Sequence, residues 1–261
     1  MVSASPPVVL VIAGNDPSGG AGLTADTQAV TALGAHPAPV VSSLTVQDTV
    51  NAYHVEAVAT QLVVAQAETV LQDMPVAAIK LGLLGTAATG KAVAQLLRAH
   101  PGIPVVLDPV LVAAGGAALA EDALVTVYLE ELLRLATVAT PNAAESRRLA
   151  PQAVDAAARA AELLARGVPH VLVKGADETT PEVTNTLYSR DGGPRAFTWP
   201  RLPGNYHGSG CTLAAAIAAL LAHGRGVPQA VAEAQAYTWK ALQQGWRLGR
   251  GQIIPDRRIV P

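Results

Sequence analysis

Short apolar runs alternate along the chain with longer segments of helical spacing. The runs are rich in valine, isoleucine and leucine and are apolar on both faces, which is typical of buried parallel strands. We predict strands over residues 8–13, 39–44, 77–81, 105–107, 136–140 and 170–173. The helical segments between them span residues 21–33, 55–73, 87–99, 122–135 and 153–166. This alternation predicts an α/β fold with an open, mostly parallel sheet and helices on both faces.

The pattern changes after residue 174. Two strand-like segments, 183–188 and 195–199, flank the turn sequence Arg-Asp-Gly-Gly and predict a hairpin at the sheet edge. Two long helices are predicted over 209–222 and 227–246, and the tail 249–261 as an ordered loop or strand end. Because no linker or internal repeat stands out, we expect residues 1–261 to form a single domain.

Composition narrows the class of protein. Half of the 261 residues are hydrophobic and only 15% are charged, which argues against a disordered chain. A net charge of -2 with 3% aromatic residues argues against a nucleic-acid partner. The longest apolar stretch, 213–222, is about half of the ~20 residues that span a bilayer. The start has no basic segment typical of a secretory signal, so we expect a cytoplasmic protein with no membrane partner.

Cysteine usage removes two further classes. Cys211 is the single cysteine of the chain, so an intramolecular disulfide and a cysteine-based zinc cluster are excluded.

A glycine-rich segment, residues 14–22, directly follows the first predicted strand. Ligands of open α/β sheets bind beyond the carboxyl ends of the strands, and glycines let backbone amides approach a ligand. The segment lacks the lysine of a phosphate-binding Walker loop and the spacing of a dinucleotide fingerprint. A structural turn is therefore an equal alternative. Asp26 lies one turn further on. Its carboxylate could face the sheet edge, or it could simply interact favourably with the dipole at the helix N-terminus.

A second glycine-rich segment, residues 206–212, opens a strongly apolar helix. Free amides at the start of a buried helix need a partner, and a phosphate would satisfy them. Cys211 falls in the first turn, where the helix dipole lowers the pKa of a thiol. The alternative is a small buried residue that only packs.

Polar residues also follow three other predicted strands. Asn142 and Glu145 share one helix face and would suit Mg²⁺, or would simply cap that helix. Asp108 and Lys174 each stand at a strand end, where the lysine could hold a nucleotide phosphate. Five polar sites at one edge of a sheet together predict a ligand site.

Three motifs are similar to those of a known family. They are Gly-Asn-Asp-Pro-Ser-Gly-Gly-Ala-Gly at 14–22, Pro-Asn-Ala-Ala-Glu at 141–145 and Gly-Ser-Gly-Cys-Thr at 208–212. In this order they resemble the hydroxymethylpyrimidine/phosphomethylpyrimidine kinases of thiamine biosynthesis, members of the ribokinase-like superfamily. The resemblance runs from Val8 to about Leu248. It implies a three-layer α/β/α fold, commonly homodimeric, that transfers the ATP γ-phosphate to a pyrimidine hydroxymethyl group and, in a second step, to the pyrimidine monophosphate.

The resemblance also implies roles for individual residues. The pyrimidine pocket would be lined by Gly14, Asp26, Gln47 and Leu83. The anion hole would consist of Gly208, Ser209, Gly210 and Cys211, with Cys211 at the position of the general base. The helix dipole lowers the pKa of this thiol and the ATP phosphates would raise it again, so we expect a base near neutrality. Binding of ATP would involve Lys174, Thr212 and Asn142. Mg²⁺ would be organised, directly or through water, by Asp108 and Glu145 together with Asn142.

The chain departs from the family pattern in three places. The usual Ala-Lys-Ser-Gly flap is Ala-Ala-Gly-Gly at 113–116, and its missing lysine and serine bear most on the second phosphorylation. The usual Lys-Gly-Gly is Lys-Gly-Ala at 174–176, and Ala-Gln-Asn-Thr is Val-Gln-Asp-Thr at 46–49. Two alternatives stay open: a pyridoxal or pyridoxine kinase of the same superfamily, and a non-catalytic nucleotide- or vitamin-binding relative.

Overall fold

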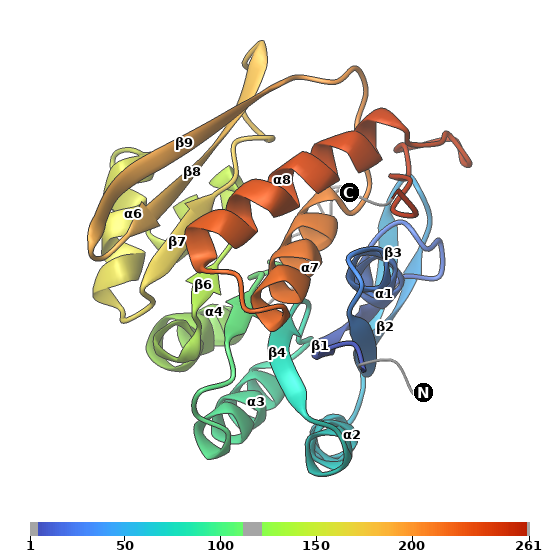
Figure 1. Ribbon diagram of the computed structural model, residues 1–261, viewed down its shortest axis with the longest axis vertical. Helices are drawn as coiled ribbons and strands as arrows, with labels where there is room; N and C mark the ends of the chain where they lie inside the picture. Colours follow the sequence, from blue (N-terminus) through green and yellow to red (C-terminus); the bar gives the residue numbers. More distant parts are fainter. Residues whose placement is uncertain (1–4, 112–121, 260–261) are drawn as a thin grey trace.

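The computed structural model describes residues 5–111 and 122–259, and its centre is a nine-stranded sheet (Figure 1). The strand order is β3-β2-β1-β4-β5-β6-β7-β8-β9. The six strands β2, β1, β4, β5, β6 and β7 pair in parallel in this order. At the edges, β3 pairs antiparallel with β2, β8 with β7, and β9 with β8. The strands are β1 (Val8–Asn15), β2 (His36–Gln47), β3 (Ala52–Ala57), β4 (Val76–Leu81), β5 (Val105–Leu107), β6 (Val138–Ala139), β7 (His170–Val173), β8 (Glu182–Ser189) and β9 (Gly192–Pro200). The predicted mostly parallel α/β sheet is confirmed.

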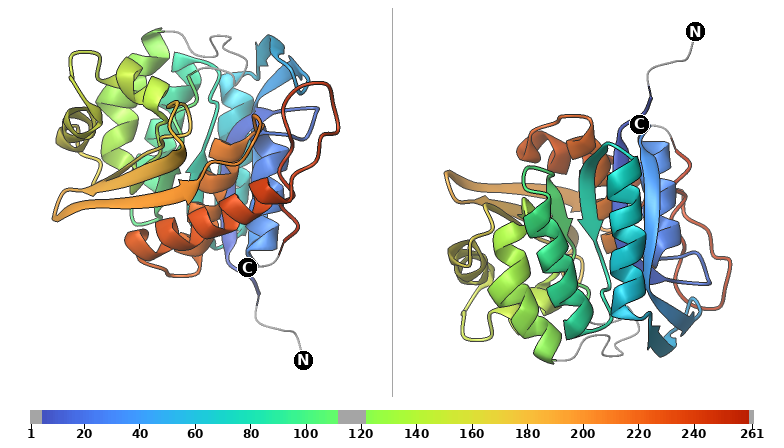
Figure 2. Two further views of the ribbon diagram at one scale, coloured as in Figure 1. Left: turned by 90° about the horizontal axis from the view of Figure 1, so that it is seen from above. Right: turned by 90° about the horizontal axis from the view of Figure 1, so that it is seen from below.

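Helices cover both faces of the sheet and complete the three layers (Figures 1 and 2). One layer contains α1 (Gly22–Ala32), α7 (Ser209–Ala222) and α8 (Val227–Gln243). The other contains α2 (Thr60–Asp73), α3 (Ala87–Ala99), α4 (Asp122–Val127), α5 (Ala143–Leu149) and α6 (Ala156–Ala165). Helix α4 continues as a π-helical turn over Tyr128–Leu132 and a 3₁₀ turn over Leu133–Leu135.

Two sequence predictions about the elements are wrong in detail. Residues 55–57 belong to β3, which pairs with β2, and the predicted helix 55–73 begins only at Thr60. The side chains of β3 alternate towards solvent at an open edge, so their pattern lacks the apolar run that marks a buried strand. The last predicted helix stops at Gln243 instead of residue 246, because Trp246 pairs with Ile254 of the returning tail.

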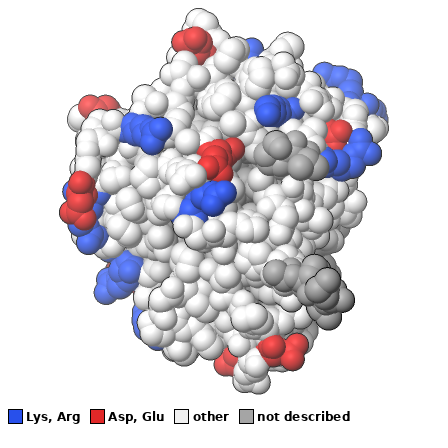
Figure 3. Space-filling model, viewed as in Figure 1, with Lys and Arg blue, Asp and Glu red and all other residues white. Residues whose placement is uncertain are grey.

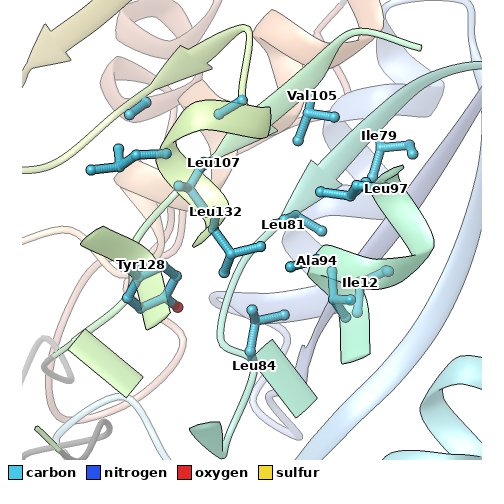
Figure 4. Close-up of a cluster of buried hydrophobic side chains, with 14 of the residues drawn as sticks. Ile12, Ile79, Leu81, Leu84, Ala94, Leu97, Val105, Leu107, Tyr128 and Leu132 are labelled. Atoms are coloured by element: carbon cyan, nitrogen blue, oxygen red, sulfur yellow. The ribbon is translucent and has the colours of Figure 1, made fainter. Parts of the chain in front are cut away.

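The hydrophobic core consists of two layers of side chains, one on each face of the β-sheet. On the face of α2 and α3, the side chains of Ile12, Ile79 and Leu81 pack against Leu97 and Leu132 (Figure 4). On the other face α7 is apolar on every side, as a helix enclosed between sheet and neighbouring helices must be. Burial of α7 against the strands aims its N-terminus at the carboxyl edge of the sheet.

Charged side chains on the surface are sparse and of both signs. Figure 3 shows them scattered over the face that carries α8, with no broad basic patch there. Within residues 5–111 and 122–259, no helix has the length and apolar character that crossing a membrane requires.

Removing core contacts at the centre of the sheet should destabilise the fold strongly. Ile79 is fully buried in β4, so Ile79→Ala should lower the free energy of unfolding by about 2–5 kcal/mol. Val154 is 91% exposed, and Val154→Ala should change the free energy of unfolding by less than about 0.5 kcal/mol. Urea unfolding followed by circular dichroism measures both variants, and equal stabilities would contradict this description of the core.

Candidate active site

A pocket of about 610 Å³ opens at the carboxyl ends of the central strands. It brings together residues from segments far apart in the sequence, as the strand-edge argument predicts. The predicted site residues that line it are Gln47, Asp108, Asn142, Glu145, Lys174, Gly208, Ser209, Gly210 and Cys211. Four others are outside this lining: Gly14, Asp26, Leu83 and Thr212. Residues 113–116, where the sequence differs from the Ala-Lys-Ser-Gly flap of the family, lie outside the described residues.

Two glycine-rich loops meet beside the pocket. Gly208 precedes α7 with a φ of 70°, a conformation that favours glycine. A Cβ on Gly208 would lie 2.1 Å from the carbonyl oxygen of Gly20, and a Cβ on Gly20 would lie 2.1 Å from the ring of His207. Because no side chain of residues 5–111 and 122–259 caps α7, the amides of its first turn remain available at the pocket wall. Such a helix start attracts anions.

A buried lysine and a buried aspartate form the polar floor of the pocket. Lys174 Nζ lies 2.8 Å from Asp108 Oδ1, and the Thr140 hydroxyl donates to the same oxygen at 3.0 Å. Burial opposes the charged form of both, but Lys174 holds the pKa of Asp108 below its usual value and Asp108 raises that of Lys174. A Cβ on Gly210 would lie 3.0 Å from the Lys174 ammonium, so the lysine sits directly against α7.

Asn142 and Glu145 form the helix cap that the sequence left as an alternative. The Glu145 amide donates to Asn142 Oδ1 at 2.7 Å, and the Asn142 amide donates to Glu145 Oε2 at 2.8 Å. Burial raises the pKa of Glu145 to about 7, against the effect of Lys174. The cap and a metal role are compatible, because the carboxylate still lines the pocket.

The donor set fits a divalent cation held through water better than one held by side chains alone. In the ranges that the structure describes, no three acidic, histidine or cysteine side chains cluster closely enough to hold a metal. The hydrogen bonds to Asp108 in those ranges end on Oδ1 and the one to Glu145 ends on Oε2. The second oxygen of each carboxylate therefore suits the water-rich shell that Mg²⁺ keeps.

Lys80 is the functional-site neighbour that the sequence analysis missed. Its ammonium lies 2.8 Å from Asp26 Oδ2, and both side chains are fully buried. Burial raises the pKa of Asp26 to about 6, although Lys80 opposes this, and the acidic neighbours keep the pKa of Lys80 above its usual value. The signal was a lysine inside an apolar strand, since a buried ammonium must be paired. Asp26 is thus enclosed with Lys80. Gly14 and Leu83 are neighbours, because a Cβ on Gly14 would lie 3.1 Å from the Leu83 side chain and 2.7 Å from the Ser43 hydroxyl of β2.

The expected near-neutral base at Cys211 is wrong for this state of the protein. Burial raises the pKa of the thiol to about 11, and the negative charges of Asp26 and Asp108 add to this effect. The charge of Lys80, the second-largest influence, and the hydrogen bond from the Gly22 amide lower the pKa but do not offset the burial. The expectation weighed the helix dipole against repulsion by the ATP phosphates, whereas desolvation of the thiol depends on the folded surroundings.

A histidine lies between the first glycine-rich loop and Gln47. His207 Nε2 lies 2.9 Å from Asp16 Oδ2 and 3.3 Å from Gln47 Nε2, while its buried Nδ1 has no hydrogen-bond partner among the described residues. The partnerless Nδ1 places the ring proton on Nε2, from which it is donated to Asp16. The same nitrogen cannot then accept from Gln47, so the amide of Gln47 remains available to a ligand in the pocket.

The fold and the site together define a class of protein. The three-layer α/β/α fold is that of the ribokinase-like small-molecule kinases. At one edge of its sheet lie the open amides of a buried helix start, a paired lysine and two carboxylates. The chain belongs to the phosphomethylpyrimidine kinase family, whose sequence profile matches residues 16–256.

Individual relatives agree with this assignment. A hydroxymethylpyrimidine/phosphomethylpyrimidine kinase from Rhizobium meliloti is 40% identical over 256 residues, which cover 94% of each chain. The pyridoxal kinase from Staphylococcus aureus, solved in complex with AMP-PCP and pyridoxal, superposes with a TM-score of 0.88 at 28% identity, covering 98% of this chain and 94% of that one. The phosphomethylpyrimidine kinase from Clostridium difficile 630 gives 0.78 at 27% identity, covering 90% and 99%.

The thiol of Cys211 should ionise far above neutrality. With a pKa of about 11, its rate of alkylation by iodoacetamide should still rise about tenfold per pH unit at pH 9.5. The urea-unfolded chain should instead level off near the ordinary thiol pKa of about 8.5. Since the chain has one cysteine, mass spectrometry reads the modification directly. A plateau below pH 8 in the folded protein would restore the near-neutral base.

Proposed function

We propose that the protein phosphorylates the hydroxymethyl group of 4-amino-5-hydroxymethyl-2-methylpyrimidine with ATP, as a step of thiamine biosynthesis. The observation that carries the proposal is the Lys174–Asp108 pair held against the open amides of α7, inside a chain of this kinase family. This arrangement presents positive charge and hydrogen-bond donors at one point of the pocket. Phosphoryl transfer requires alignment and charge neutralisation at such a point.

The reaction places each group in a definite role. The substrate hydroxyl oxygen forms a bond to the γ-phosphorus while the bond to the β,γ-bridging oxygen breaks and ADP leaves. The amides of Gly208, Ser209 and Gly210 and the Lys174 ammonium would stabilise the charge on the transferring group. Cys211 would take the hydroxyl proton only as a thiolate, so with a pKa of about 11 it would first have to release its own proton to water.

ATP is the donor that the neighbouring structures support. The Staphylococcus aureus pyridoxal kinase binds AMP-PCP, an analogue of ATP, within the same fold. In this chain Trp199 and Trp239 stack with ring centroids 5.9 Å apart, and both line the pocket. We place the adenine on this apolar side, with the phosphates directed towards Lys174.

Mg²⁺ would neutralise phosphate charge at the acidic side of the pocket. Asp108 and Glu145 would hold it through water, and Asn142 would keep Glu145 in position through the capping box. Thr212 stays a weaker candidate for contact with ATP, because its fully buried hydroxyl donates to the Gly208 carbonyl at 2.8 Å.

The remaining features of the proposal concern the whole protein. The chain would act as one kinase domain in the cytoplasm, and as a homodimer. The apolar side chains exposed along β2, β3 and the turn between them support the dimer: Leu44, Val46, Val50 and Tyr53 are each about half exposed or more.

Pyridoxal phosphorylation is the second candidate. The pyridoxal kinase superposes better than the phosphomethylpyrimidine kinase structure, with TM-scores of 0.88 and 0.78. Pyridoxal also carries a hydroxymethyl group on an aromatic ring. The pyrimidine is favoured because the 40% identical relative is named for it.

A coupled assay of ADP release tests the proposal. The purified protein with ATP and Mg²⁺ should turn over the hydroxymethylpyrimidine with a higher kcat/KM than pyridoxal or pyridoxine. A third arm with the pyrimidine monophosphate measures the second phosphorylation separately. Higher kcat/KM with a B6 vitamer would overturn the substrate, and no turnover of any of these alcohols would favour a binding protein.

Gln47 should read the heteroatom edge of the ring. Gln47→Leu removes its hydrogen bond to the pyrimidine and should raise KM for the pyrimidine about tenfold, the effect of one lost hydrogen bond. KM for ATP should stay unchanged. Gln61 is exposed on α2, so Gln61→Leu is the control. An equal loss of affinity for both substrates would place Gln47 in the scaffold.

Glu145 should act through the metal. Glu145→Gln keeps an oxygen that can accept from the Asn142 amide but loses the charge, so half-maximal activity should require about tenfold more Mg²⁺. The fold should not suffer at pH 8. Burial raises the carboxyl pKa from 4.5 to about 7, so the wild type loses stability as the pH rises through that range. Wild-type Mg²⁺ dependence in the variant would leave Glu145 with the capping role alone.

A further inference from the structure

Arg257 places a buried guanidinium beside the pocket without belonging to its lining. The residue lies in the tail after α8 and is only 1% exposed. It forms no ion pair with a carboxylate within residues 5–111 and 122–259. A buried charge of this kind is costly, and burial indeed lowers its pKa from the usual value. A charge buried at this cost points to a function for its position.

The guanidinium donates to neutral oxygens of three separate segments. The acceptors are Thr212 Oγ1 at 2.7 Å, the carbonyl oxygens of Gly20, Gly19 at 3.4 Å and His207 at 3.4 Å, and Gln28 Oε1 at 3.3 Å. Thr212 is in the first turn of α7, and His207 directly precedes that helix. Gly19 and Gly20 belong to the turn after β1. One side chain therefore joins the turn after β1 to both sides of the start of α7.

The tail holds this arginine from the opposite side. The Tyr237 hydroxyl of α8 donates to the Arg257 carbonyl at 2.8 Å, and the Asp256 amide donates to the Ala241 carbonyl at 2.9 Å. Ile253 also pairs with the loop at Tyr206. The guanidinium is thus clamped between α8 and the two glycine-rich loops.

We propose that Arg257 is a positioning residue that holds the amides of Gly208 to Gly210 in the orientation that stabilises the transferring phosphoryl group. The inference rests on the proposed kinase function. The glycines of both loops have no side chains to fix their path, so their alignment needs an external anchor. Arg257 supplies one, because a fork of planar N–H donors fixes distance and direction at once.

Charge adds to this positioning. Lys80 and Lys174 are each offset by an aspartate, whereas Arg257 is not. Its positive charge therefore contributes to the potential at the start of α7 without contact with the substrate. Donors fixed in advance act mainly in the transition state, so loss of Arg257 should affect kcat more than KM.

The test compares Arg257→Met and Arg257→Lys in the ADP-release assay. Arg257→Met should lower kcat about 100-fold, the effect of misplacing a group near the chemistry, with both KM values within about threefold. Arg257→Lys keeps the charge but not the fork and should lower kcat about tenfold. Calorimetric affinity for ADP with aluminium fluoride and Mg²⁺, a mimic of the transferring phosphoryl group, should fall in parallel with kcat. Affinity for ADP alone should not change.

A matched control separates positioning from stability. Arg159 is also a buried arginine, but it lies on α6 and outside the pocket lining. Arg159→Met should leave kcat and the affinity for the mimic unchanged, whatever its effect on Tm.

Folded Arg257 variants with wild-type kcat and mimic affinity would overturn the proposal, and so would equal losses of affinity for ADP and the mimic. If Arg257→Met does not fold, Arg257→Lys decides by the same criteria. Absence of turnover in the wild type would instead refute the proposed function.

Discussion

Close contact between two glycine-rich loops is the constraint on which the site depends. Gly208 can lie against the carbonyl of Gly20, and Gly20 against the ring of His207, because a Cβ at either position would overlap its neighbour. This contact brings the turn after β1 to the start of α7. It leaves the first amides of α7 uncapped at the wall of the pocket. Without it, the helix start would not share a pocket with the strand ends.

Buried ion pairs then determine what this helix start faces. Lys174 reaches α7 because Gly210 leaves room for its ammonium, and Asp108 keeps that ammonium charged. Lys80 and Asp26 form a second pair behind Cys211. Single removal of either partner of a buried pair is strongly destabilising, so these charges are fixed before any substrate binds. Such fixed charges need no rearrangement when charge develops on a phosphoryl group.

The sequence predicted the elements that carry regular patterns and the site residues that follow buried strands. The predicted spans for α3, β5, β7 and α7 match the observed ones, and Asp108, Asn142 and Lys174 meet at one pocket as expected. The sequence did not predict edge strand β3, because its polar side chains alternate towards solvent. The Cys211 pKa could not be read from spacing, since it depends on desolvation by residues distant in the chain. The role of Arg257 required knowing that the tail folds back onto α7.

The central claim is that the transferring phosphate lies between the first turn of α7 and Lys174. A crystal structure with AMP-PCP, Mg²⁺ and the hydroxymethylpyrimidine measures this directly. We expect the γ-phosphate oxygens about 2.7–3.1 Å from the Gly208–Gly210 amides and within reach of Lys174, with the substrate hydroxyl beside the Cys211 sulfur. A γ-phosphate bound elsewhere in the pocket, away from the start of α7, would contradict the account.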